Sequence, residues 1–181
     1  MSNPSGLQEN CTHSINDCVV YKKHGICRIE DIRNENFSDM GERKYYVLTS
    51  VFGPSSKLYV PADGEMVKSS IRRVLTVTEI EDAITVGGKL EVNLPQDVKE
   101  RTAFFEEVID SFDRARIYSV YKTLTKNKEN LINNNKKTLK ATDEKMLTLV
   151  QKILFDEISF VVDIERDKVL EYIESVISKK R

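Results

Sequence analysis

The spacing of hydrophobic residues changes once along this chain, near residue 76. Before that point apolar and polar residues alternate in short runs bounded by turn residues, which predicts β-strands. After it, apolar residues recur every three or four positions, which predicts amphipathic helices. The pattern therefore predicts an α+β protein of two domains, a small β-domain followed by an all-α helical bundle.

The first half is expected to contain five short strands joined by tight turns. Gly25 suits a turn after the first strand, because a residue without a Cβ adopts positive φ at little cost. Tyr45 and Tyr46 are consecutive in one strand, so alternation places their side chains on opposite faces. Five short strands in about sixty residues favour a small barrel. The expected strands are 17–21, 25–34, 43–52, 56–61 and 70–74.

The second half begins with the capping-box pattern Thr76-x-x-Glu79, which predicts a helix start. Gly87-Gly88 is expected to end that helix, so residues 76–97 are interpreted as a short helix and a linker. Thr142 and Asp163 are expected to cap the last two helices. The expected long helices are 98–112, 114–125, one after Thr142 and one after Asp163, with 126–140 at least partly a loop.

These elements define the expected organisation of the chain. Residues 1–13 are polar, with neither a basic start nor an apolar core, and are expected to be a disordered extension rather than a signal peptide. The predicted domains are a β-domain at 14–75, the linker at 76–97 and a helical domain at 98–181. No apolar run is long enough to span a membrane.

Cysteine usage and motifs exclude several functions. Cys11, Cys18 and Cys27 form no Cys-x-x-Cys pair and have no matching histidines, which argues against a zinc site and fits a reducing cytoplasm. No hydrolase, metalloprotease, P-loop or dinucleotide motif is present. We therefore expect no catalytic residue, no metal and no cofactor, and a protein that is not an enzyme.

Charge is unevenly distributed, although the net charge is only −1. Residues 114–145 hold nine Lys/Arg against three Asp/Glu, whereas residues 79–113 and 146–178 are acidic. A basic island within an acidic half is a candidate phosphate-binding surface. The alternative is a solvated helix face with surplus lysines.

The stretch from Asn16 to Ile32, with its Asp-x-Val-Val-Tyr-x-x-His-Gly pattern, resembles the opening signature of the CarD/CdnL family of bacterial transcription regulators. The same module is the polymerase-binding domain of transcription-repair coupling factor. The resemblance continues in order through Tyr45–Leu48, Lys57–Pro61 and Ile71–Val74. It implies an SH3-like or Tudor-like barrel at 14–75.

The resemblance also implies the barrel's partner, the β subunit of bacterial RNA polymerase, with a strand added at the barrel's open edge. Family positions that carry contacting arginines match Glu35 and Tyr59 here. Arg28, Arg33 and Lys57 lie nearby in the sequence and are expected to supply the positive charge instead.

For the helical domain the resemblance implies contact with promoter DNA, without sequence specificity, and modulation of the open promoter complex. Val98 takes the place of a tryptophan that wedges into the minor groove. The expected phosphate contacts are Lys99, Arg101, Arg114, Lys122 and Lys145. The protein is expected to act as a monomer in the complex.

A second hypothesis stays open. The acidic stretches on both sides of the basic island and the absence of tryptophan also fit a protein-binding adaptor. Such an adaptor would dock on polymerase or another partner without touching DNA.

Overall fold

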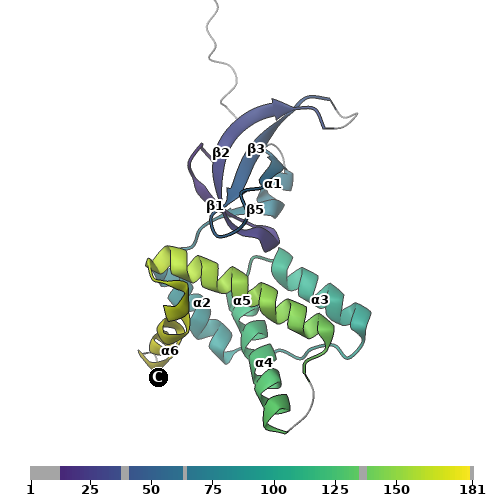
Figure 1. Ribbon diagram of the computed structural model, residues 1–181, viewed down its shortest axis with the longest axis vertical. Helices are drawn as coiled ribbons and strands as arrows, with labels where there is room; N and C mark the ends of the chain where they lie inside the picture. The colour runs from purple at the N-terminus through teal and green to yellow at the C-terminus, as the bar shows by residue number, and fades with distance from the viewer. Residues whose placement is uncertain (1–12, 38–40, 63–64, 135–137, 180–181) are drawn as a thin grey trace, which may run out of the picture. The chain divides into compact units, whose positions relative to one another are not determined.

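The computed structural model describes residues 13–37, 41–62, 65–134 and 138–179. The chain divides into two compact units, here called the sheet unit (1–74) and the helical unit (75–181) (Figure 1). The boundary falls where the hydrophobic period changes, and the α+β class is confirmed. The extension predicted at 1–13 lies almost wholly outside the described residues.

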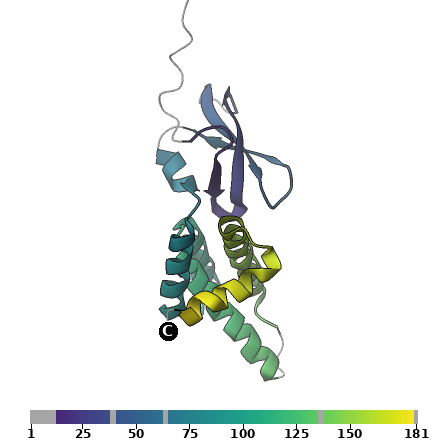
Figure 2. The same cartoon turned by 90° about the vertical axis from the view of Figure 1, so that its left-hand side faces the viewer.

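The sheet unit contains an antiparallel sheet of five strands in the order β4-β3-β2-β1-β5. Each strand lies within two residues of its predicted bounds. The sheet is not closed, and the barrel detail of the prediction is not confirmed. The unit contains β1 (Cys18–Tyr21), β2 (Gly25–Glu35), β3 (Arg43–Ser50), β4 (Lys57–Pro61), the short helix α1 (Glu65–Ser70) and β5 (Ile71–Arg73) (Figure 2).

One face of the sheet carries the core of this unit. Tyr46 is fully buried on that face, whereas Tyr45 lies on the other face, as alternation predicted. Gly25 has a φ of 75°, which confirms its place in the turn after β1. The buried core residues are Val19, Cys27, Ile29, Tyr46, Leu48, Val60, Ala62, Val67 and Ile71.

A β-bulge in β2 decides which residues point away from this core. Ile29 pairs with Leu48 and Asp31 pairs with Val47, so Glu30 is an extra residue in the ladder. An extra residue reverses the alternation of side chains between the two faces. Residues of even number before the bulge and of odd number after it therefore share the face opposite the core.

The described part of the helical unit is built on the long central helix α5, whose buried side chains face α2, α3, α4 and α6. Within the described ranges, no helix combines the length and apolarity needed to cross a bilayer. The elements are α2 (Val77–Lys89), α3 (Val98–Asp110), α4 (Arg114–Asn133), α5 (Ala141–Val162), the 3₁₀ turn η2 (Arg166–Lys168) and α6 (Val169–Lys179).

Helix α2 starts with the predicted capping box, in which Thr76 and Glu79 exchange hydrogen bonds. The prediction that Gly87-Gly88 ends the helix is wrong, since α2 continues to Lys89. A Cβ at Gly87 would lie 2.4 Å from the Ala115 carbonyl oxygen of α4. The glycine therefore serves close helix–helix packing rather than helix termination, and α2 belongs to the core of this unit.

The other boundary differences are at helix ends. Helix α4 runs to Asn133, across most of the region expected to be partly a loop. Helix α5 begins after Lys140 without a side-chain cap, so Thr142 is not its cap. Asp163 adopts a left-handed conformation, with φ of 57°, and ends α5 instead of capping α6. Side-chain capping signals and left-handed C-terminal residues share the same polar residue types, which explains this error.

Candidate functional site

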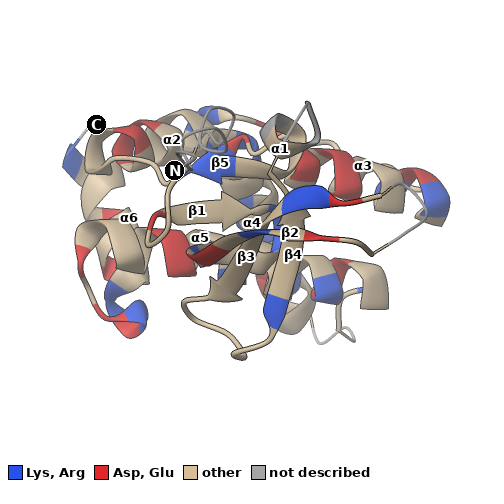
Figure 3. Ribbon diagram, turned by 90° about the horizontal axis from the view of Figure 1, so that it is seen from above, with Lys and Arg blue, Asp and Glu red and all other residues tan. Residues whose placement is uncertain are grey.

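The five residues predicted to contact polymerase lie on one face of the sheet, opposite the core. Arg28 precedes the bulge, and Arg33 and Glu35 follow it, so the reversed alternation brings all three to the same side. Lys57 and Tyr59 alternate with the buried Val60 and partly buried Leu58 on β4. Through Thr49 of β3, Arg28 and Lys57 stand in one row across the sheet. Figure 3 shows the strands that carry these charges.

Arg33, Glu35 and Tyr59 are joined by direct contacts. The Arg33 Nη2 donates to the Tyr59 hydroxyl at 2.6 Å, and its Nε lies 2.7 Å from a Glu35 carboxylate oxygen. The guanidinium carbon also lies 5.5 Å from the centre of the Tyr59 ring, within the range of a cation–π contact. The guanidinium is thus oriented before any partner binds, while its side chain is 42% exposed.

Two aromatic residues that the sequence reasoning did not assign extend this group. Phe37 is 57% exposed, and its ring packs edge-on against Tyr45 and Tyr59 at centroid distances of 5.2 and 4.9 Å. Phe37 continues the period of two that begins at Arg33 and Glu35. That spacing is the available signal in the sequence, although Phe37 stands among polar residues and lies two positions beyond the end of β2. We call Arg33, Glu35, Phe37, Tyr45 and Tyr59 the aromatic–arginine patch.

The patch adjoins the edge of the sheet. Strand β4 pairs only with β3, so its second edge has no strand partner among the described residues. An unpaired edge presents backbone N–H and C=O groups that a further strand can use. A partner at this edge could therefore form backbone hydrogen bonds with β4 and side-chain contacts with the adjoining aromatic–arginine patch.

In the helical unit, two of the predicted phosphate contacts are buried in ion pairs. The Arg101 Nη1 lies 2.8 Å from an Asp143 carboxylate oxygen, and its Nε donates to the Pro95 carbonyl at 2.7 Å. The Arg114 guanidinium pairs with Glu157, which also accepts the Leu75 backbone N–H at 3.3 Å. Both arginines hold remote segments together, so a direct role in phosphate binding does not fit them.

Lys122 also has a partner within the fold. Its Nζ donates to the Gly88 carbonyl at 2.6 Å and the Leu90 carbonyl at 3.0 Å, at the C-terminal end of α2. Unpaired carbonyls at a helix end are stabilised by a cation placed there. Lys122 therefore caps the C-terminal end of α2. The sequence does not indicate this role, because the carbonyl partners lie more than thirty residues away.

The remaining predicted DNA contacts are exposed. Val98 is 57% exposed in the first turn of α3, and Lys99 follows it; Asp97 caps this helix by accepting the Lys99 N–H at 2.9 Å. Lys145 is exposed in the first turns of α5. The Arg101–Asp143 ion pair joins the starts of α3 and α5. It thereby positions the exposed residues around it.

Other groups provide little chemistry. Cys18 and Cys27 are not joined in a disulfide, and Cys11 lies outside the described residues. In the described ranges, no group of three or more His, Cys, Asp and Glu side chains could hold a metal ion. Burial raises the pKa of Tyr118 and of Tyr121 above the usual 10.0, so both phenols stay neutral at physiological pH.

Comparison with known proteins supports the assignment of the sheet unit. Residues 13–75 match the family model of the CarD-like/TRCF RID domain, a family of RNA polymerase-interacting domains. A search of the curated proteins found no match. The matched range covers the whole sheet, both of its edges and the aromatic–arginine patch. The sheet unit of this chain is therefore similar to the CarD-like/TRCF RID domain over residues 13–75.

Proposed function

We propose that this chain is a CarD-like transcription regulator of bacterial RNA polymerase. The sheet unit binds the polymerase β subunit, and the helical unit contacts upstream promoter DNA without reading its sequence. The family match over residues 13–75 carries this proposal. A protein with these partners acts in the cytoplasm, as a monomer in the promoter complex and without catalysis.

The polymerase contact is supported by the geometry of the exposed face. The β4 edge offers backbone hydrogen bonds for an added strand, which supplies affinity. The aromatic–arginine patch beside it offers rigid rings and an oriented guanidinium, the side-chain types that dominate binding energy at protein interfaces. Arg28 and Lys57, both exposed, add positive charge to the same face.

The DNA contact is supported by exposed cations at the starts of α3 and α5. Lys99 and Lys145 were expected there, and Lys126 and Lys140 are further exposed lysines on α4 and at the start of α5. Lysine contacts to phosphate give affinity without sequence preference. Val98 offers an aliphatic wedge with a small surface, so it favours melted over paired DNA only weakly.

The proposed domains follow from these roles. Residues 14–75 form the polymerase-binding domain and residues 98–181 carry the DNA-contacting residues. The segment 76–97 includes α2, which packs against α4 and extends the core of the helical unit. Regulation requires that the protein bind open and closed promoter complexes with different affinities.

The polymerase contact is tested by binding of the full chain to isolated β subunit in calorimetry. Arg33→Glu should weaken binding at least about fivefold, because a hot-spot side chain contributes more than about 1 kcal/mol. Lys179→Glu, an equal charge reversal at the exposed last residue of α6, is the control and should have no effect. Absence of binding at tens of micromolar would contradict the proposal.

The DNA contact is tested by titrating salt against affinity for a duplex. The logarithm of affinity should fall linearly with the logarithm of salt, and Lys145→Ala or Lys99→Ala should each reduce the slope by about 0.9. Lys168→Ala, an exposed lysine near the other end of α5, is the control. An affinity independent of salt, or strongly dependent on sequence, contradicts non-specific phosphate binding.

A protein-binding adaptor is the second candidate. The observation that favours it is the internal use of Arg101, Arg114 and Lys122, which removes three cations from the predicted DNA surface. Binding to β subunit together with failure to bind any duplex at low salt would select the adaptor.

A further inference from the structure

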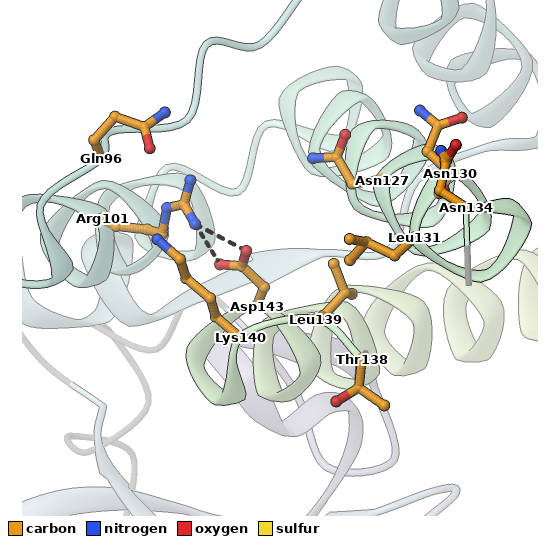
Figure 4. Close-up of a pocket in the computed structure, with 10 residues that line it drawn as sticks. All are labelled: Gln96, Arg101, Asn127, Asn130, Leu131, Asn134, Thr138, Leu139, Lys140 and Asp143. Carbon is orange, nitrogen blue, oxygen red and sulfur yellow. Dashed lines mark hydrogen bonds and ion pairs between the residues drawn. The ribbon is translucent and has the colours of Figure 1, made fainter. Parts of the chain in front are cut away.

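Two cavities of the helical unit differ in whether their buried polar side chains have partners. Figure 4 shows the one at the start of α5, where Arg101 and Asp143 bond to each other and the asparagines of α4 are exposed. The other, of about 340 Å³, is lined by residues of α2, α4 and α6. It is lined by Tyr118, a buried residue whose phenol has no partner among the described residues.

Two glycines of α2 place the Tyr118 ring. A Cβ at Gly87 would lie 3.0 Å from the ring carbon Cδ1, and a Cβ at Gly88 would lie 3.9 Å from Cε1, the next carbon along the ring. The ring edge therefore runs along α2 from Gly87 to Gly88, and the hydroxyl lies at the Gly88 end. Gly88 itself lines the cavity. The Gly87-Gly88 pair thus brings the phenol to this cavity.

The Tyr118 hydroxyl is a hydrogen-bond donor that the fold does not use. The residue is only 5% exposed, and buried tyrosine hydroxyls usually have a partner. In the part of the chain that the structure describes, this hydroxyl makes no hydrogen bond. Because burial keeps the pKa of the phenol above its usual 10.0, the O–H remains a donor at physiological pH. A ligand in the cavity would supply the missing acceptor.

The charged side chains of the cavity are both cationic. Lys89 is exposed at the end of α2 and forms no ion pair within the described ranges. The Lys122 ammonium is held by the carbonyls at the end of the same helix, so it adds positive charge without a free donor. None of the seven residues that line the cavity is acidic. The unused groups are therefore donors, and they suit a ligand group that only accepts hydrogen bonds.

The rest of the lining is mostly apolar. Ile84 is buried and Ile177 of α6 is half-buried. The Thr85 hydroxyl donates to the Glu81 carbonyl at 2.8 Å and needs no further acceptor. The volume lies at the lower end of the range of about 300–1,000 Å³ that is typical of small-ligand sites. The cavity therefore suits a small molecule with a hydrocarbon body.

We propose that this cavity binds a small aliphatic carboxylic acid in its ionised form. The carboxylate accepts a hydrogen bond from the Tyr118 hydroxyl and faces Lys89, while the hydrocarbon chain packs on Ile84 and Ile177. An ionised carboxylate only accepts hydrogen bonds, which matches the unused donors. This site lies apart from the residues proposed to contact polymerase and DNA, so the inference does not depend on either contact.

The experiment titrates the full chain with hexanoate and follows the amide chemical shifts of the protein. Hexan-1-ol, which has the same chain length without the charge, is the matched probe. The shifts with hexanoate should gather at the residues that line the cavity. Hexanoate should bind at least about fivefold more tightly than hexan-1-ol, because hydrogen bonds to an ionised acceptor are about twice as strong as neutral ones.

Substitutions at the cavity separate ligand binding from folding. Tyr118→Phe should weaken hexanoate binding at least about tenfold, because it removes the donor to the carboxylate. The same substitution should leave the melting temperature of the free protein unchanged or raised, since the hydroxyl has no partner to lose. Tyr121→Phe is the control, because Tyr121 lies on the same helix outside the cavity lining, and it should not change the affinity.

Two further variants test the shape and the charge of the site. Gly88→Ala should weaken hexanoate binding at least about threefold, because the new methyl group would occupy space in the cavity. Its Cβ would meet only the Tyr118 ring, at an ordinary contact distance, so the fold should keep its stability. Lys89→Met should weaken binding about two- to fivefold, as expected for an exposed ion pair, and this loss should shrink at high salt.

Three results would overturn the inference. The first is the absence of shifts at the cavity with tens of millimolar hexanoate. The second is equal binding of hexanoate and hexan-1-ol, which would exclude recognition of the carboxylate. The third is an unchanged affinity of Tyr118→Phe, or a clear loss of stability in the free variant, which would show that the hydroxyl serves the fold.

Discussion

The sheet unit and the helical unit use their cations in opposite ways. In the sheet unit, Arg28, Arg33 and Lys57 stand on the exposed face, and Arg33 is oriented there by surface neighbours. In the helical unit, Arg101 and Arg114 are buried in ion pairs. The same residue types are therefore accessible to a partner in one region and hold the fold together in the other.

The difference reflects how each kind of element assigns a face. In a strand, side chains alternate between the two faces, so the position number alone predicts whether a residue faces the core. A bulge shifts this alternation by one residue. In a helix bundle, whether an arginine is buried or exposed depends on whether a carboxylate from another helix lies opposite it. Asp143 and Glu157 lie 42 and 43 residues away from Arg101 and Arg114.

The largest expected effect is a loss of stability in the helical unit when its buried Arg114–Glu157 ion pair is broken. Arg114→Ala should lower the free energy of unfolding by about 3–5 kcal/mol, because it leaves the buried Glu157 carboxylate without its counter-ion. Urea unfolding followed by far-UV circular dichroism measures this change. Arg114→Met combined with Glu157→Leu should recover most of the stability, since no buried charge remains. A loss below about 1 kcal/mol for the single variant would mean that the pair is not structural.

The next effect concerns the close packing of α2 against α4 at Gly87. Gly87→Ala should destabilise the protein by about 1–3 kcal/mol, because the new methyl group would overlap the Ala115 carbonyl. Gly88→Ala is the matched control, since its Cβ would meet only a Tyr118 ring carbon at 3.9 Å. That control should be neutral or more stable by up to about 1 kcal/mol. Equal effects of both substitutions in the unfolding assay would refute this packing.

A substitution at Lys122 tests whether this residue stabilises the fold or contacts DNA. Lys122→Met should lower the free energy of unfolding by about 1 kcal/mol, since three carbonyls at the end of α2 lose a charged donor that is partly solvent-screened. The slope of DNA affinity against salt should stay unchanged. A reduced slope with unchanged stability would return Lys122 to the DNA surface.

The smallest stability effect is expected in the sheet unit. Arg33→Ala should change the free energy of unfolding by less than about 1 kcal/mol, because its ion pairs with Asp31 and Glu35 are exposed. The same substitution should weaken binding to β subunit. A large loss of stability would show that this arginine is architectural too, and the contrast between the units would fail.

Local signals predicted the fold well and the helical site poorly. All five strands, the turn at Gly25 and the capping box at Thr76 depend on neighbours within a few residues, so the sequence indicates them directly. Helix α1, of six residues, is too short to display a period. The roles of Arg101, Arg114 and Lys122 depend on partners brought together only by folding. Phe37 was not assigned because it stands among polar residues, two positions beyond the end of β2.

The bulge at Glu30 also makes the chain unequally tolerant of two kinds of genetic change. Substitutions at Arg33 or Glu35 alter one exposed side chain and leave the pairing with β3 intact. A codon deletion that removed Glu30 would change parity for every later residue of β2. Ile32 would then turn to the surface, while Arg33 and Glu35 would face the core. The exposed face of β2 can therefore change by substitution, whereas the pairing register of the strand tolerates no gain or loss of a single residue at the bulge.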